Sequence, residues 1–423
     1  MCRGGRGTES HLNGIRPSGE AHLTPRQRVL CALSHREGDR VPIDLGGTES
    51  SGMTGAAYLR LCDYIKVKDA ARIFDVSQQA ALIGEDVRRR FRVDTAALVF
   101  EPARWAPDTT TDGRPALSPA GWKPEIQKDG SRVVKDRDAR VVARMPAGGF
   151  YYDSTWCPLS GVTGPSELPD YARFFEEFDK PDFLDEGWDA MAQRAEALHT
   201  HTDYCVVANL CVHILAGGQL LRGFENFMMD LAADERLACA VMERLLEAYI
   251  PRVDTFARRM SQWVDVVLVN DDLGTQGGPM LSPEMYRKTV KKYHAMLYRH
   301  IKKRTGKPLL MHSCGSIYRL IPDLIDIGVD AINPVQVSAS DMDSRKLKAE
   351  FGKDITFWGG GCDTQKVLGA GTPEDVRDEV RRRIQDLAPS GGFIFTQVHN
   401  IQPNVPPQNV VAMLEAALEF GAY

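Results

Sequence analysis

The chain has 423 residues, of which 43% are hydrophobic and 26% charged, enough for a sizeable buried core in an ordinary globular enzyme. Its formal net charge of −5 gives no electrostatic reason to expect nucleic acid or an anionic membrane as a partner. The sequence contains no apolar run of about 18 or more residues, the length that a membrane-spanning helix needs.

The first 22 residues, MCRGGRGTESHLNGIRPSGEAH, are rich in glycine and polar residues and lack the apolar core of a signal peptide. We expect residues 1–22 to form a poorly ordered tail and residues 23–423 to form one folded unit. With no export signal, the nine cysteines are expected to be reduced thiols in a cytoplasm. Their odd number also argues against a disulfide framework. A reducing compartment favours a metal-binding interpretation of any close Cys/His pair.

Short apolar runs bounded by turn residues predict eight buried parallel strands. In chain order they lie at 40–47, 94–102, 204–212, 264–272, 308–315, 329–335, 355–361 and 391–400. Amphipathic helical patterns lie between most of them, such as 282–304 and 372–388, which begin with the helix-start pairs Ser-Pro and Thr-Pro. This alternation predicts an α/β fold, a (β/α)8 TIM barrel with an N-terminal helical extension; an open doubly wound sheet is the alternative.

One region, residues 103–152, interrupts the alternation. It contains the stretch WKPEIQKDGSRVVKDRDARVVARMPAGGFYY, with alternating apolar residues and a Lys-Asp-Gly-Ser turn at 128–131. That pattern is typical of a β-hairpin, so we expect an antiparallel insertion between the second and third barrel strands. The insertion could be a lid, a surface that docks a partner, or a β-decoration without a role.

The fifth predicted strand is followed by an imidazole and a thiol one residue apart, His312 and Cys314 in KPLLMHSCGS. Barrel enzymes build their sites at the C-terminal ends of the strands, and residues i and i+2 of an extended segment point to the same side. Cys362 follows the seventh strand at the same end of the barrel, after the glycines of FWGGGC. These three side chains predict a zinc site with one open position for substrate. The alternative is that they are buried or incidental residues.

Other polar residues at the strand ends are candidates for catalysis or substrate binding. Asp271 and Asp272 could serve as a base, a fourth zinc ligand or a substrate clamp, and helix capping explains them equally well. His399 could bond to substrate or to a ligand, and a structural histidine is nearly as good an explanation. The remaining candidates, all for substrate contacts, are Asn270, Gln336, Gln365 and Asn400.

From about residue 24 onward the chain resembles the uroporphyrinogen decarboxylase-like superfamily, and within it the zinc-containing methyltransferases that work with corrinoid proteins. The matching stretches are TPRQRVLCALSHREGDRVPIDLGG, DDLGTQGGPMLSPEMYRK, HSCGSIYRLIPDLIDIGVDAINPVQ, FWGGGCDTQKVLGAGTPEDV and VHNIQPNVPPQNV. The resemblance implies a (β/α)8 barrel. It also implies zinc held by an H-x-C pair and a later cysteine, here His312, Cys314 and Cys362.

Two features distinguish this chain within the superfamily. The decarboxylases carry an arginine-rich N-terminal motif for the carboxylates of the tetrapyrrole, whereas residues 41–59 contain no arginine, which argues against porphyrinogen decarboxylation. Many relatives lack a cysteine at position 362, so its presence favours the metal-binding branch. Relatives in the superfamily often pair, so a homodimer is one possible state, and the sequence does not determine the oligomeric state.

We therefore expect a zinc-dependent methyltransferase that exchanges methyl groups between a small molecule, a thiol or a methoxylated compound, and a corrinoid. The chain has no cobalamin-binding D-x-H-x-x-G motif, so the corrinoid (cobalamin) would arrive on a partner protein. Zinc can keep a bound thiol deprotonated at neutral pH, or it can bind the oxygen of a methyl donor. The alternatives are a metal-free decarboxylase-type lyase and a non-enzymatic binder of a corrinoid or tetrapyrrole.

Overall fold

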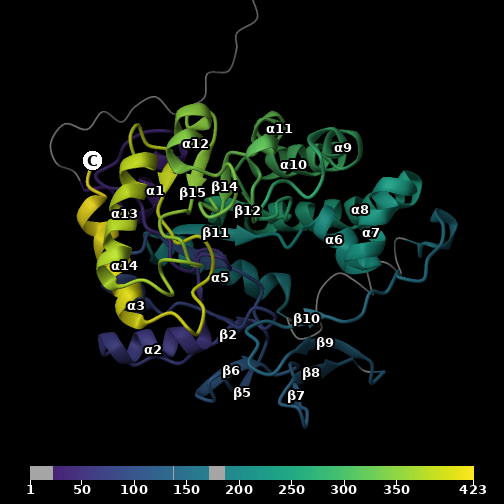
Figure 1. Cartoon of the computed structure of the whole chain (residues 1–423), viewed down its shortest axis with the longest axis horizontal. Helices are drawn as coiled ribbons and strands as arrows, with labels where there is room; N and C mark the ends of the chain where they lie inside the picture. Colours follow the sequence, from purple (N-terminus) through teal and green to yellow (C-terminus); the bar gives the residue numbers. More distant parts are fainter. Residues whose placement is uncertain (1–21, 137, 171–185) are drawn as a thin grey trace, which may run out of the picture.

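The computed structural model describes residues 22–136, 138–170 and 186–423, so the tail expected at 1–22 lies outside the described residues except for its last position. Seven parallel strands form one sheet in the order β16-β15-β14-β13-β12-β11-β4. Figure 1 labels β15, β14, β12 and β11 near the middle of the molecule. Their bounds are β4 Thr95–Leu98, β11 Cys205–Asn209, β12 Val266–Asn270, β13 Leu309–His312, β14 Ala331–Asn333, β15 Thr356–Trp358 and β16 Phe393–Ile394. Each lies within a run that the sequence predicts to be a strand.

The first predicted strand, at 40–47, closes the sheet. Ile43 forms a parallel bridge with Phe395, and the backbone N–H of Asp44 donates to the carbonyl of Phe395 at 2.8 Å. On the other side the N–H of Asp94 donates to the carbonyl of Ile43 at 2.7 Å. The segment therefore fills the position between β16 and β4, and the protein has the predicted TIM-barrel-like α/β fold rather than an open sheet.

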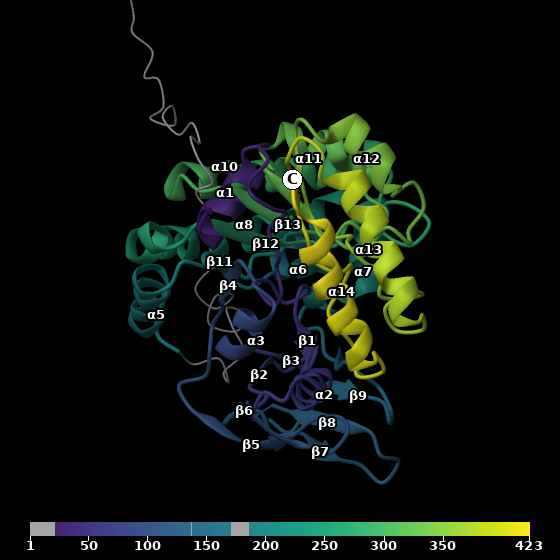
Figure 2. The same ribbon diagram turned by 90° about the vertical axis from the view of Figure 1, so that its left-hand side faces the viewer.

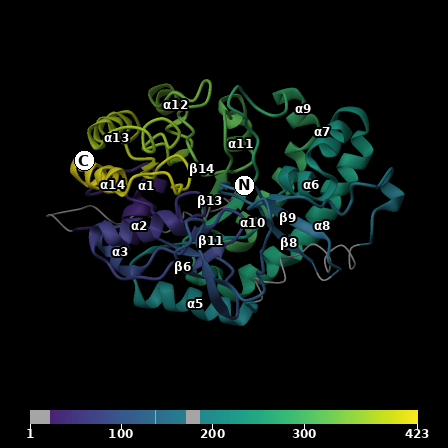
Figure 3. The same cartoon turned by 60° about the horizontal axis from the view of Figure 1, so that its bottom comes forward.

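Helices surround the strands (Figure 3). Their bounds are α1 Pro25–Leu33, α2 Gly55–Ile65, α3 Glu85–Arg90, α5 Trp188–His201, α6 Leu215–Arg222, α7 Phe224–Ala233, α8 Glu235–Met260, α9 Pro283–Thr289, α10 Lys291–Thr305, α11 Ile321–Asp326, α12 Ser344–Phe351, α13 Pro373–Leu387 and α14 Pro407–Phe420. The last two run side by side in Figure 2. None of the helices in the described ranges combines the length and the apolar character needed to traverse a lipid bilayer.

Alternate residues along the barrel strands belong to two different clusters of the core. Cys205, Val207, Val266 and Leu268, with their counterparts on the later strands, pack inside the barrel together with Val29 of α1. The residues between them pack outward against the helices. This two-residue period means that the last inward-facing position of each strand lies at the mouth of the barrel.

The predicted helix starts are present, but one predicted helix is divided. Thr372 and Asp375 form a capping box at the start of α13. The predicted helix at 282–304 is capped by Ser282 and is divided at Val290 into α9 and α10. The hydroxyl of Thr289 donates to the carbonyl of Met285, a competing bond that bends helices.

The antiparallel insertion lies at the bottom of Figure 1. A hairpin, β5 Trp105–Thr109 with β6 Pro115–Pro119, is followed by β7 Glu125–Ile126, β8 Arg132–Lys135, β9 Val141–Met145 and β10 Asp153–Ser154, in the sheet order β10-β9-β8-β7. The predicted turn at 128–131 joins β7 to β8, with Gly130 at φ +79°. A further small sheet consists of β1 Met53–Thr54, β2 Ile73–Asp75 and β3 Ala80–Ala81.

Candidate metal centre

Several strands end in a polar residue at the inward-facing position. Asn209 ends β11, Asn270 ends β12, His312 ends β13 and Asn333 ends β14. The sheet register pairs Asn270 with His312 and His312 with Asn333. The apolar interior of the barrel therefore gives way to a set of hydrogen-bonding side chains at its C-terminal mouth, which is where barrel enzymes place their sites.

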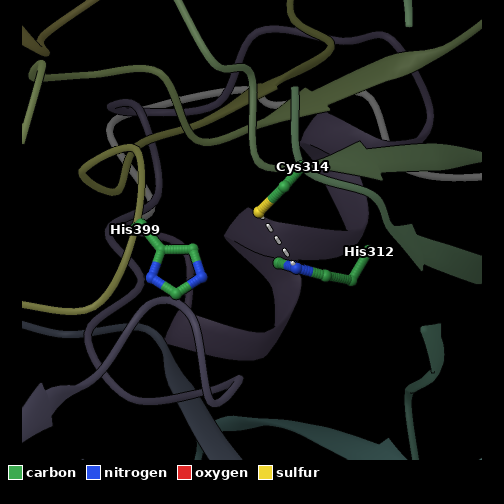
Figure 4. Close-up of side chains that lie close together, drawn as sticks. All are labelled: His312, Cys314 and His399. Carbon is green, nitrogen blue, oxygen red and sulfur yellow. Dashed lines mark hydrogen bonds between the residues drawn. The ribbon is translucent and has the colours of Figure 1, made fainter. Parts of the chain in front are cut away.

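Three side chains at this mouth bring metal-ligating atoms together. The ligand atoms of His312, Cys314 and His399 all lie within 4.8 Å of one another, and they form the one such group of three or more found in the described ranges. The sulfur of Cys314 is 3.5 Å from Nε2 of His312. Figure 4 shows the ring of His399 facing this pair from a separate loop, the one that follows β16.

An asparagine fixes the orientation and the tautomer of His312. The amide nitrogen of Asn333 donates to the carbonyl of Trp358 at 3.0 Å, so its Oδ1 faces the other way. That oxygen accepts hydrogen bonds from Ser50 Oγ at 2.6 Å and from His312 Nδ1 at 2.9 Å. In the neutral ring that a metal binds, the proton therefore lies on Nδ1, and Nε2 carries the lone pair on the side of Cys314.

His399 is held in a similar way. Its Nδ1 lies 2.8 Å from Oδ1 of Asn400, a residue that is 1% exposed. The amide nitrogen of Asn400 donates to Gln78 at 3.2 Å, which directs the oxygen toward His399. The same oxygen accepts the hydroxyl of Tyr151, from the inserted segment, at 2.8 Å. Both histidines thus present Nε2 as a ligand atom, the arrangement usual for imidazole bound to metal.

The electrostatic surroundings favour a thiolate at Cys314. Burial opposes its ionisation, but the charge and hydrogen bond of His312 and a hydrogen bond from His399 lower the pKa of Cys314 to about 7. Burial likewise lowers the pKa of His312, but Cys314 raises it to about 10. Two imidazoles and one thiolate in contact are a donor set that zinc binds well. A bound zinc ion would replace the ion pair between His312 and Cys314 with bonds from both side chains to the metal.

The carboxylate of Asp272 borders the group. Its Oδ1 accepts the backbone N–H of Cys314 at 2.7 Å and lies 3.7 Å from Nε2 of His312. Gly315 follows the cysteine at φ +84°, and a Cβ there would lie 2.4 Å from the backbone of Gly274. A glycine is needed after Cys314 because the two loops pack backbone against backbone.

Cys362, the predicted third ligand, does not join His312 and Cys314. Its side chain is fully buried within the cluster that packs strands against helices, where Glu379 and Arg383 of α13 influence its charge. Burial raises the pKa of this thiol well above its usual value, and the neighbouring carboxylates raise it further. Among the described residues His399, which the sequence suggested only as a possible bonding partner, occupies the third position instead.

Asp271 has a different set of contacts from its neighbour. It is 1% exposed, and its carboxylate accepts the backbone N–H groups that open α6, from Ile214, Leu215 and Ala216. Nε2 of His294 lies 2.7 Å from the same carboxylate. Burial raises the pKa of Asp271, but these bonds hold it below its ordinary value. These contacts are those of a helix cap, the alternative weighed for this position.

The other predicted contacts are distributed unevenly. Asn270 lies beside His312, and its Oδ1 is buried without a hydrogen-bond partner in the described structure. Gln336 is 7% exposed and accepts the N–H of Gly315 at 2.7 Å, which fixes the ligand loop. Gln365 is exposed beyond Asp363, and the structure gives its side chain no contact with the group of His312, Cys314 and His399.

Residues that sequence reasoning missed include Ser50, Asn209 and Asn333. Each forms its bonds at the mouth through the side chain rather than through a recognisable motif. A signal for two of them was present, because Asn209 and Asn333 are polar residues that interrupt predicted apolar runs, as His312 does. Ser50, in a loop without periodicity, offered no such signal.

Comparisons with known proteins agree with this architecture. A family model described as uroporphyrinogen decarboxylase (URO-D) matches residues 209–420, the half of the chain that carries the candidate metal centre. A uroporphyrinogen decarboxylase from Pseudoalteromonas translucida (strain TAC 125) is 38% identical over 52 residues, 12% of this chain and 15% of that protein. Another from Alkalilimnicola ehrlichii (strain ATCC BAA-1101 / DSM 17681 / MLHE-1) is 40% identical over 45 residues, 11% and 12% of the two chains. The chain therefore matches well under two thirds of the length of these curated relatives.

A solved structure described as a methyltransferase from Methanosarcina mazei is similar over almost its whole length. It superposes with a TM-score of 0.57 and covers 94% of this chain and 99% of that chain. The sequence identity of 16% limits what this likeness shows to the fold.

Proposed function

This chain belongs to the uroporphyrinogen decarboxylase family, and from that premise we propose that it is a zinc-dependent methyltransferase rather than a decarboxylase. The observation that carries the proposal is the convergence of His312, Cys314 and His399 within 4.8 Å at the mouth of the barrel. A porphyrinogen carries several carboxylates that need cationic partners, and residues 41–59, from the first barrel segment into α2, contain no arginine.

The residues present fit a zinc ion. His312 and His399 would bind it through Nε2 because each Nδ1 is committed to an asparagine oxygen, and Cys314 would bind it as a thiolate. Three protein ligands leave a coordination position for a small molecule. A bound zinc ion would keep a substrate thiol deprotonated at neutral pH, or would polarise the oxygen of a methoxy group.

The identity of the third ligand changes the charge of the site. Two thiolates would neutralise a divalent ion, whereas one thiolate with two neutral imidazoles leaves a net positive charge. A more positive centre favours the ionisation of an incoming thiol, and it lowers the nucleophilicity of the resulting thiolate. Asp272, next to His312, is placed to offset part of that charge.

The chain's own residues would position the small molecule while a methyl group passes between it and a corrinoid carried by a partner protein. In the direction that forms a thioether, a corrinoid would supply the methyl group, and the carbon–sulfur bond would form as the cobalt–carbon bond breaks. The corrinoid would keep the electron pair of the broken bond, so the transfer would need no further oxidant or reductant.

Metal analysis and a transfer assay test the proposal. Protein purified under reducing, chelator-free conditions should contain about one zinc ion per chain. It should also speed methyl transfer from free methylcobalamin to 2-mercaptoethanol, measured by the loss of methylcobalamin absorbance. His312→Ala and Cys314→Ser should lose both properties, while Cys31→Ser, a cysteine on α1, should keep them.

Metal-free wild-type protein from such a preparation, unable to take up added zinc, would refute the proposal. The decarboxylase alternative, favoured by the short matches to two decarboxylases, makes the opposite prediction. It requires consumption of uroporphyrinogen by chelator-treated protein, at a rate that Cys314→Ser leaves unchanged.

A further inference from the structure

The carboxylate of Glu49 lies in the loop after the first barrel segment, at the mouth that holds the candidate metal centre. Its Oε1 accepts a hydrogen bond of 2.6 Å from the amide of Asn209, the last residue of β11. Its Oε2 is buried and has no hydrogen-bond partner in the described part of the chain. A buried carboxylate oxygen without a donor is costly, so this position calls for a donor that a ligand would bring.

The position of Glu49 is fixed relative to His312. The next residue, Ser50, donates to the same oxygen of Asn333 that accepts Nδ1 of His312. The loop carrying Glu49 is thus joined to the orienting partner of the first metal ligand. Burial raises the pKa of Glu49, and the neighbouring charge of His312 opposes that rise.

Two further carboxylates lie around the same mouth. Asp272 is 3.7 Å from His312. The charge of Asp75 raises the pKa of Glu49. The charge of His399 in turn acts to lower the pKa of Asp75. The hydrogen bonds to Asp75 come from the backbone of Ser77 and from the backbone and side chain of Gln78. Within the described ranges, the hydrogen bonds and ion pairs of these three carboxylates include none from lysine or arginine.

We propose that the small molecule handled at this site carries a protonated amine, and that Oε2 of Glu49 accepts one of its N–H groups. This inference rests on the proposed function, for which it names the class of substrate. An ammonium group supplies both the missing donor and a positive charge among three carboxylates. A sulfonate or carboxylate at the same place would meet like charges without a cationic partner, and a neutral hydroxyl would supply the donor alone.

Two other acceptor atoms at the mouth agree with a ligand rich in donors. Asn270 Oδ1 and Gln402 Oε1 are also buried without partners in the described structure. Asn270 pairs with His312 in the sheet, and Gln402 donates to the oxygen of Asn400 that holds His399. An amine with more than one N–H can reach more than one such oxygen.

The test compares three thiols of similar size that differ in their second group. Cysteamine, 2-mercaptoethanol and 3-mercaptopropionate are titrated into the full chain by calorimetry, with and without added zinc. Wild type should bind cysteamine more tightly than 2-mercaptoethanol, and 3-mercaptopropionate most weakly. Glu49→Gln should reduce the preference for cysteamine over 2-mercaptoethanol about tenfold, the size of one charge-assisted hydrogen bond.

The design separates charge recognition from thiol acidity. The three thiols differ in acidity, but that difference is the same for both variants and cancels when the two preference ratios are divided. Glu125→Gln, an exposed glutamate of β7 paired with Lys135, is the matched control and should leave the ratio unchanged. Thermal melting establishes that Glu49→Gln is folded, and Asp75→Asn, which removes a second charge, should lower the ratio by a smaller factor.

The outcomes distinguish this inference from the proposed function. Equal preference ratios in wild type and Glu49→Gln, with zinc bound, would overturn the amine proposal and leave the methyltransferase standing. Tighter binding of 3-mercaptopropionate than of cysteamine would overturn it too. A chain that takes up no zinc but keeps a Glu49-dependent preference for the amine would sink the proposed function instead, because the carboxylate belongs to the protein and acts without the metal.

Discussion

Cys314 and Cys362 each lie a few residues beyond a strand of the same parallel sheet, yet their thiols are in opposite environments. Cys314 is partly exposed beside two imidazoles, which lower its pKa to about 7. Cys362 is fully buried in the cluster of strand and helix residues, and burial raises its pKa well above the ordinary value. One thiol is prepared for a cation, and the other serves as a small apolar side chain.

The paths of the two loops explain the difference. His312 is the last residue of β13, and Cys314, two residues on, remains on the same side. Trp358 at the end of β15 also faces the barrel interior, but Gly359 and Gly360 follow it at φ +113° and +79°. Those dihedrals end the alternation of the strand, so the side to which Cys362 points no longer follows from counting residues. Spacing predicts the direction of a side chain only while the backbone stays extended.

The largest expected difference between the two thiols is in their reactivity. In metal-free protein at neutral pH, iodoacetamide should modify Cys314 at least about 1,000-fold faster than Cys362, because the buried thiol reacts only after local opening. Mass spectrometry of the two peptides measures the ratio, and added zinc should protect Cys314. Comparable rates with zinc protection at both sites would restore the His/Cys/Cys ligand set that the sequence suggests.

The two candidate ligand sets share His312 and Cys314 and differ in the third residue, His399 or Cys362. Substitution of each third residue distinguishes the sets directly. His399→Ala should weaken zinc binding about 100-fold, since structural zinc sites of about 10–16 kcal/mol distribute roughly 3 kcal/mol to each ligand. Cys362→Ser should leave the affinity within about twofold, with a loss of stability from a hydroxyl in an apolar cluster. Competition with a chromophoric chelator measures both affinities.

His300→Ala is the matched control for the histidine, because it removes an imidazole that contacts Asp254 away from the mouth. Should Cys362→Ser lose zinc while His399→Ala retains it, the glycine loop must rearrange on metal binding. The test is informative because the two loops are bonded to each other. The carbonyl of Cys362 accepts the N–H of Val398, the residue next to His399.

The comparison also shows which parts of the molecule the sequence could predict. The barrel strands could be predicted because each buried run is apolar over several residues and bounded by turn residues, as in LLMH before Ser313. The helix caps at Ser282 and Thr372 could be predicted because a hydroxyl residue followed by a proline is a local signal for a helix start. The division of the predicted helix at Val290 coincides with a bond from the Thr289 hydroxyl to the carbonyl of Met285, which composition does not reveal.

The candidate site was predictable in part for the same reason. His312 and Cys314 form a local pair, so one short extended segment determines their convergence. Asp271 and Asp272 are adjacent in the sequence, and only their contacts distinguish the helix cap from the residue that borders the centre. Asn333 is joined to Ser50 across 283 residues, and a bond between such distant positions cannot be read from a single sequence.

Substitution of Asn333, which accepts Nδ1 of His312, is expected to have the next smaller effect on zinc affinity. Asn333→Ala should weaken zinc binding about 10-fold, because His312 loses the acceptor that fixes its tautomer. Asn409→Ala, which removes a buried asparagine that donates to Leu368 and Gly371, should cost comparable stability without changing zinc affinity. Equal zinc affinities in the two variants would show that Asn333 has only a structural role.

The smallest expected effect on zinc affinity tests whether the inserted segment contributes to the candidate metal centre. Tyr151 is the residue of the inserted segment that reaches Asn400, where its hydroxyl shares one oxygen with Nδ1 of His399. Tyr151→Phe removes one hydrogen bond of about 0.5–1.5 kcal/mol, of which only a part reaches the metal, so zinc affinity should fall about threefold. Chelator competition measures this change, with Tyr64→Phe, an exposed tyrosine of α2, as the control. The effect should vanish in a His399→Ala background, because Tyr151 acts through that imidazole; an unchanged effect there would mean that the insertion supports the fold and not the ligand.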